Sequence, residues 1–161
     1  MKYSYLFITL LISFSPLIAK AEAPKMSQKA VNETVDKYGA IYCKEGLNAL
    51  KEAVQECYKN TPDTSPELDK CIVADRALAS IAVRKNIKYE NIYGPFKKDP
   101  STIDPYYSAE IHNPREKYYL SSPRFTKDPT LSKLDHFELS GYFPGFASLP
   151  DILTKRCPGT Y

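Results

Sequence analysis

Apolar residues recur at helical spacing between residues 27 and 86, and the pattern predicts three helices. The first is expected over Ser27–Tyr38, with Ser27 as its N-terminal cap and Gly39 as its stop. The second is expected over Lys44–Lys59. Its apolar residues share one face of a 3.6-residue period: Leu47, Leu50, Val54, Cys57 and Tyr58.

The third helix is expected over Pro66–Asn86, with Ser65 as its cap and Pro66 at its first position. It is apolar around most of its circumference, which is typical of a helix at the centre of a domain. The connector before it, residues 60–65, has the composition of a turn. A connector this short predicts that the second and third helices form an antiparallel hairpin.

Residues 87–161 have a different character, with nine prolines, eight tyrosines and five phenylalanines. Short helices are expected at residues 129–139 and 150–155, Asn113-Pro114 resembles the start of a turn, and Lys117–Leu120 is a strand candidate. The expected fold is therefore mainly α. A disulfide-stapled helical hairpin and an N-terminal helix would form a helical half, residues 27–86, with the irregular Pro/Tyr-rich half, residues 87–161, packed on it.

The first 21 residues have the three parts of a secretory signal peptide in the required order. Lys2 supplies the positive charge, the apolar run Tyr5–Ile18 follows, and Ala19-Lys20-Ala21 is a small-x-small cleavage pattern. The run is shorter than the roughly 20 apolar residues of a membrane-spanning helix. We expect cleavage after Ala21 to leave residues 22–161 as one small periplasmic or secreted domain, without a membrane span.

Charge gives no indication of a polyanionic partner. Loss of Lys2 and Lys20 with the signal lowers the formal net charge from +3 to +1. A nearly neutral chain gives no reason to expect nucleic acid as a partner.

Four cysteines in an exported chain predict two disulfides. Cys57, near the end of the second helix, and Cys71, early in the third, would lie at similar height beside the turn. Cys43 is 14 residues before Cys57, about 21 Å along a helix axis at about 1.5 Å per residue. Because a disulfide needs Cα atoms within about 7 Å, the expected pairs are Cys57–Cys71 and Cys43–Cys157. The spacing matches no zinc site, and we expect no metal and no cofactor.

Few residues suggest catalysis. Asp75 falls within the apolar stripe of the third helix, where a carboxylate needs a partner, and a structural salt bridge is the expected explanation. Arg76 and Arg84 are expected at the surface. His112 and His136 are general-base candidates, with Asp75 or Asp135 as the carboxylate. Ser140-Gly141 follows His136, but the G-x-S-x-G motif of a nucleophilic serine is absent.

The aromatic residues of the second half are the most unusual feature of the composition. Such rings can fill a core, and they can also bind a sugar or a peptide. The segment 142–146 carries Pro144 and Gly145 between aromatic rings and is the favoured binding loop. The candidate binding residues are Tyr118, Tyr119, Tyr142, Phe143 and Phe146.

These observations favour a non-enzymatic binding or accessory protein of the bacterial cell envelope, with a protein or a glycan as partner. A small envelope hydrolase that uses a His–carboxylate pair is one alternative. A structural subunit with an aromatic oligomer interface is another. The sequon Asn32-Glu-Thr34 is expected to be unused, because the signal has a bacterial form.

Overall fold

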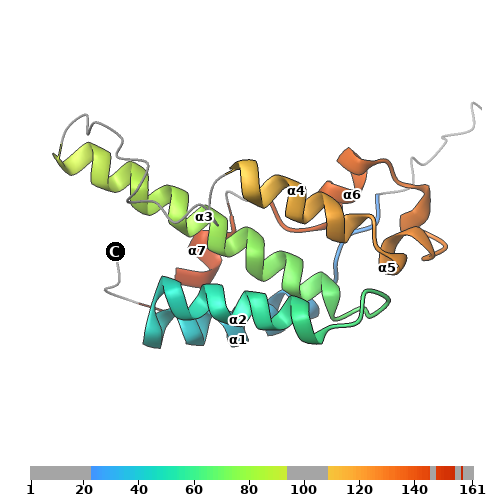
Figure 1. Ribbon diagram of the computed structural model, residues 1–161, viewed down its shortest axis with the longest axis horizontal. Coiled ribbons are helices and arrows are strands. Elements are labelled where there is room, and N and C mark those ends of the chain that lie inside the picture. The colour runs from blue at the N-terminus through green and yellow to red at the C-terminus, as the bar shows by residue number, and fades with distance from the viewer. Residues whose placement is uncertain (1–22, 94–108, 146–147, 155–156, 158–161) are drawn as a thin grey trace, which may run out of the picture.

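A computed structural model describes residues 23–93, 109–145, 148–154 and 157 (Figure 1). Within these residues the chain is helical and contains no strand. The elements are α1 (Gln28–Glu45), α2 (Leu47–Asn60), α3 (Leu68–Tyr93), α4 (Ala109–Leu120), α5 (Pro123–Thr126), the 3₁₀ turn η3 (Leu131–Lys133), α6 (His136–Tyr142) and α7 (Leu149–Thr154). The expected signal, residues 1–21, lies outside the described residues.

The first helix begins where the sequence predicts but ends seven residues later. The Ser27 side chain caps α1 by accepting a hydrogen bond from the Ala30 amide, at 3.2 Å. Gly39 does not stop the helix, because it is buried in the interior of α1 where Leu153 of α7 approaches it. The break comes at Gly46, whose φ of +86° is left-handed and favours glycine. The predicted start of the second helix at Lys44 is therefore wrong, and α2 begins at Leu47, after this break.

The hairpin of α2 and α3 is present, and α3 is the central element (Figure 1). It packs against α1, α2, α4 and α7. Residues 71–79 of α3 are buried on all sides of the helix, as its apolar circumference predicts. Helix α3 extends beyond its predicted end at Asn86 to Tyr93.

The C-terminal half is more regular than the sequence suggests. Lys117–Leu120, the strand candidate, belongs to α4, and Asn113-Pro114 lies inside the same helix instead of starting a turn. The helix expected at 129–139 is divided into η3 and α6, with Asp135 as the capping residue between them. The helix expected at 150–155 corresponds to α7. Helix α4 packs on α3, and α7 packs on both α1 and α3, so the second half packs on the helical half as expected.

Two disulfides are present, and their pairing is the one predicted from helix geometry. Cys57 of α2 is bonded to Cys71 of α3, with 5.6 Å between their Cα atoms. Cys43 of α1 is bonded to Cys157, with 5.3 Å between their Cα atoms. The second bond ties the C-terminal tail to the end of the first helix. No helix among the described residues has the length and apolarity needed to cross a membrane.

Candidate functional site

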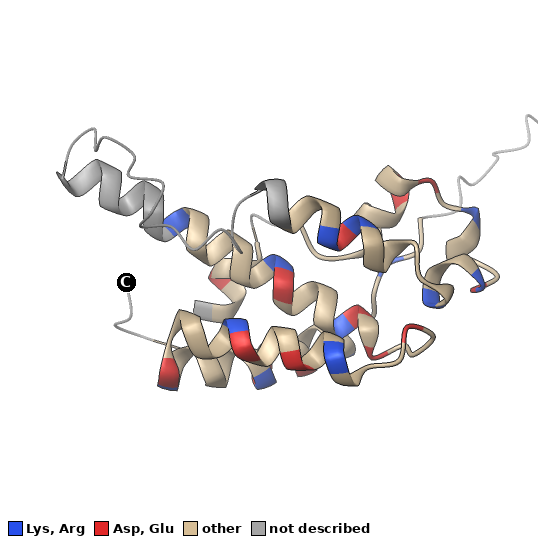
Figure 2. Cartoon of the chain, in the orientation of Figure 1, with Lys and Arg blue, Asp and Glu red and all other residues tan. Residues whose placement is uncertain are grey.

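A buried ion pair joins α3 to α4, where the two helices carry adjacent acidic and basic positions (Figure 2). The Arg76 side chain is 2% exposed, and its Nε donates to Glu116 Oε2 at 3.2 Å while Nη2 donates to Oε1. The same guanidinium donates to the backbone oxygen and to Oγ of Ser140, at 3.0 and 2.7 Å. Its carbon lies 4.9 Å from the centre of the Phe143 ring. The prediction that Arg76 lies at the surface is wrong.

A second pair lies one residue away along both helices. Arg115 donates from Nε and Nη2 to the two oxygens of Asp75, at 2.8 and 2.7 Å. The hydroxyl of Tyr58 on α2 donates to Asp75 Oδ2 at 3.2 Å. Asp75 is therefore buried inside the apolar stripe, as its position predicts, and its charge is balanced by a bidentate arginine. Arg84 is half-buried and pairs with Asp151 of α7.

His112 lies between these two pairs. Its Nε2 is 3.8 Å from Asp75 Oδ2 and 3.8 Å from Glu116 Oε2, so the histidine lies close to two acids. Both carboxylates are already bound by an arginine, and the His112 side chain is only 3% exposed. General acid–base chemistry needs a group within hydrogen-bond reach of a substrate. His112 and the two carboxylates are therefore enclosed in a network of buried charged groups.

The other residues of the hydrolase hypothesis lie on α6 or at its N-terminal cap. The Ser140 hydroxyl accepts a hydrogen bond from Arg76. His136 is exposed at the first turn of α6. Asp135 caps that helix by accepting from the Glu138 amide at 2.8 Å, while its own amide donates to the Glu138 carboxylate at 3.1 Å.

A third network connects the start of α3 to α5. Arg124 donates to both oxygens of Asp69, at 3.0 and 2.9 Å, and to Asp128 at 3.0 Å. The Tyr142 hydroxyl donates to Asp69 Oδ2 at 2.9 Å. Burial and the neighbouring Asp69 carboxylate raise the pKa of Tyr142 to about 12. Backbone amides of Leu131 and Thr130 lower the pKa of Asp128.

The candidate aromatic binding residues do not share one exposed face. Tyr118 of α4 is 73% exposed. The ring of Tyr119 stacks on that of Tyr58, with 3.8 Å between the ring centroids. The Tyr142 hydroxyl is hydrogen-bonded to Asp69. Phe143 is buried, and its ring packs against Phe125. Phe146 lies outside the described residues. In the described part of the chain, the aromatic residues of the second half thus mainly fill the core.

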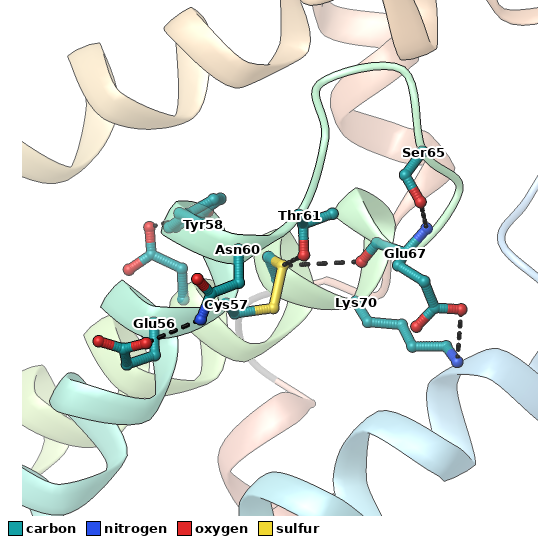
Figure 3. Close-up of a disulfide and its surroundings, with 10 residues drawn as sticks. Glu56, Cys57, Tyr58, Asn60, Thr61, Ser65, Glu67 and Lys70 are labelled. Atoms are coloured by element: carbon teal, nitrogen blue, oxygen red, sulfur yellow. Dashed lines mark hydrogen bonds and ion pairs between the residues drawn. A yellow bond between two sulfur atoms is a disulfide. The ribbon is translucent and has the colours of Figure 1, made fainter.

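A groove is open between α1, α2 and the start of α3, and we call it the α1–α3 groove. Its volume is about 520 Å³. It is lined by Glu33, Thr34, Lys37, Tyr38, Ala53, Glu56, Cys57, Asn60, Thr61, Glu67 and Lys70. Figure 3 shows the Cys57–Cys71 disulfide between its walls, with Glu56 and Asn60 on one side and Glu67 and Lys70 on the other.

Carboxylates and amines face one another across this groove. The Lys70 ammonium lies 2.9 Å from Glu33 and 3.0 Å from Glu67. The hydrogen bond to Glu33, which has the largest effect, and the hydrogen bond to Glu67 raise the pKa of Lys70. On the α2 wall, Glu56 accepts a hydrogen bond from Asn60 at 2.8 Å and lies 3.8 Å from Lys59.

A smaller pocket, of about 260 Å³, lies among the ends of α4, α5, η3 and α6. Its lining is mainly apolar: Leu120, Phe125, Leu131, Leu134 and Leu139, with Ser121, Thr126, Ser132 and His136. Neither this pocket nor the groove is lined by His112, Asp75 or Glu116.

The described residues contain no group of three His, Cys, Asp or Glu side chains placed to hold a metal ion. No protein-family model, no curated protein and no solved structure matches this chain.

Sequence patterns alone did not reveal two features of this region. No local motif indicates that Arg76, Arg115 and Glu116 form ion pairs, because the partners in these pairs lie 40 residues away in the sequence. The α1–α3 groove is formed by three helices, and its residues read as ordinary exposed positions of amphipathic helices. The position of Asp75 in an apolar stripe was the one local signal for the network.

Proposed function

We propose that this chain is an exported, disulfide-bonded binding protein of the bacterial cell envelope, without catalytic activity of its own. The observation that carries the proposal is that the buried acid–base groups and the open groove lie at different places in the fold. His112, Asp75 and Glu116 are buried among ion pairs, whereas the α1–α3 groove, which is open in the described part of the chain, is lined by residues suited to recognition.

The buried networks argue against the hydrolase alternative. Asp75 and Glu116 are each held by a bidentate arginine, and His112 lies between them with 3% of its side chain exposed. A substrate would have to break buried ion pairs, which costs about 3–5 kcal/mol when one partner is lost. Their placement supports a role in joining the second half to α3.

The α1–α3 groove supports the binding role. Its volume of about 520 Å³ falls in the range of about 300–1,000 Å³ that is usual for small-molecule sites. Three helices and a disulfide form its walls, so its shape is largely preorganised, which lowers the entropic cost of binding. The periplasm or the extracellular space suits a protein that relies on two disulfides.

Site-specific photo-crosslinking in the producing cell tests this proposal. A photoreactive amino acid would replace Lys37 in the groove, Tyr118 on the exposed face of α4, or Lys127, an exposed residue that lines neither cavity. The purified protein would be examined by mass spectrometry for adducts. We expect an adduct of constant mass from position 37 and none from position 127.

Three outcomes would overturn the proposal. Equal adduct yields at 37 and 127 would mean that the groove has no preferred occupant. Hydrolysis of ester, peptide or glycan probes that is lost in a His112→Gln variant of native stability would establish an enzyme instead. An adduct at position 118 whose partner is a second copy, with a concentration-dependent size in solution, would favour the structural subunit.

A further inference from the structure

Tyr38 presents an unused polar group to the α1–α3 groove. Its side chain lines the groove and is only 1% exposed. In the part of the chain that the structure describes, no hydrogen bond joins its hydroxyl to another residue. Buried hydroxyl groups normally have a partner, so one without a protein partner points to a ligand or water in the groove.

The electrostatic character of the groove favours a cation. Three carboxylates, Glu33, Glu56 and Glu67, line it together with two amines, Lys37 and Lys70, which leaves one negative charge in excess. The excess acid lies on the α2 wall. Glu56 has an exposed lysine, Lys59, at 3.8 Å outside the groove lining, whereas both other carboxylates share the Lys70 ammonium.

The groove already holds ammonium groups of its own chain. Lys70 is bound between two carboxylates at 2.9 and 3.0 Å, and Lys37 Nζ lies 5.0 Å from the centre of the Tyr38 ring. Charge-assisted hydrogen bonds and cation–π contacts are the two usual ways to recognise an alkylammonium group. The chemistry of the walls is therefore suited to such a group.

Apolar surface lies between the charged groups. Ala53 and Cys57 of α2 and Tyr38 of α1 line the groove together with its charged residues. This lining suits the aliphatic stem of such a group, which can lie on apolar surface while its charge stays with the carboxylates.

We propose that the α1–α3 groove binds the lysine side chain of a peptide segment. The ammonium pairs with Glu56, the stem lies along Ala53 and Cys57, and the Tyr38 hydroxyl donates to a carbonyl of the peptide backbone. Burial and the neighbouring Glu67 carboxylate raise the pKa of Tyr38, so this hydroxyl keeps its proton at neutral pH. The inference rests on the binding function proposed above and names its ligand class.

The probe is the peptide acetyl-Gly-Lys-Gly-amide, titrated into the oxidised, exported protein by calorimetry. The matched probes carry norleucine or Nε-acetyllysine in place of lysine, and glucosamine is the sugar control. Because a hydrogen bond to a charged group is worth about 1.5–3 kcal/mol, Glu56→Gln is expected to weaken lysine-peptide binding about tenfold or more. Tyr38→Phe is expected to weaken it about threefold to tenfold.

Glu52→Gln is the control variant, since Glu52 is exposed on the same helix and does not line the groove. It should leave the affinity unchanged, and circular dichroism should show that all variants keep their helix content.

The assignment would be overturned if the norleucine peptide or glucosamine bound as tightly as the lysine peptide, or if Glu56→Gln and Glu52→Gln behaved alike. If no probe bound while the adduct at position 37 was still formed, the binding function would stand and the lysine assignment alone would fail.

Discussion

Arg76 and Glu116, forty residues apart in the sequence, form a bidentate ion pair between α3 and α4, with 2% and 11% of their side chains exposed. Removing one partner of such a pair leaves a buried charge, so Glu116→Leu is expected to lower the free energy of unfolding by about 3–5 kcal/mol. The double variant Arg76→Met, Glu116→Leu should lose less than the two single variants together. Urea denaturation of the four proteins measures this coupling, and strict additivity of the losses would contradict a direct interaction.

The two disulfides are expected to stabilise the fold unequally. They close segments with sequence separations of 114 and 14 residues. In the chain-entropy model a bond that closes about 100 residues contributes about 4.7 kcal/mol, and one that closes about 15 residues about 3 kcal/mol. The Cys43→Ala, Cys157→Ala variant should therefore unfold at lower denaturant than the Cys57→Ala, Cys71→Ala variant. The reverse order would mean that strain or unfolded-state structure dominates.

Gly39→Ala is expected to stabilise the protein. Gly39 lies in the interior of α1, where glycine costs about 0.8–1.0 kcal/mol relative to alanine. An added Cβ would meet Leu153 at 3.6 Å, which is an ordinary van der Waals distance. The melting temperature should rise accordingly, and Gly46→Ala, at φ +86°, should lower it. A fall in stability for Gly39→Ala would show that α1 and α7 pack too closely for a methyl group.

Core and surface aromatic residues should respond differently to truncation. Phe143 is buried against Phe125, and the Arg76 guanidinium lies over its ring. Phe143→Ala is therefore expected to lower the free energy of unfolding by about 3–5 kcal/mol. Phe137 is 86% exposed, and Phe137→Ala should stay within about 0.5 kcal/mol of the parent. Chemical denaturation checks both. A large loss for Phe137→Ala would place that ring in a contact that the isolated chain does not contain.

Alkaline pH should weaken the fold in part through Tyr142. Its pKa is raised to about 12 in the folded protein, chiefly by burial and then by Asp69, and is about 10 when the chain unfolds. The unfolded state therefore loses this proton first, so the contribution of Tyr142 is complete below pH 10 and declines as the pH rises toward 12. Tyr142→Phe should show a shallower loss of stability above pH 10. Parallel curves for the two proteins would contradict the shift.

Local sequence patterns were sufficient for much of the helical half. The cap at Ser27, the α2–α3 hairpin and the apolar circumference of α3 follow from residues within a few turns of one another. The disulfide pairing followed as well, because the rise of a helix limits which cysteines can meet. The burial of Asp75 also followed from the sequence, because Asp75 falls within the apolar stripe of its helix.

Tertiary packing decided what depended on partners distant in the sequence. Gly39 continues a helix because α7 packs on it, whereas the left-handed backbone at Gly46 ends it. Arg76 is buried because Glu116 and Ser140, 40 and 64 residues away, satisfy its donors. The α1–α3 groove exists only where three helices meet. A periodic pattern records which face of a helix is apolar, but a polar group is buried or exposed according to whether the fold supplies its partner.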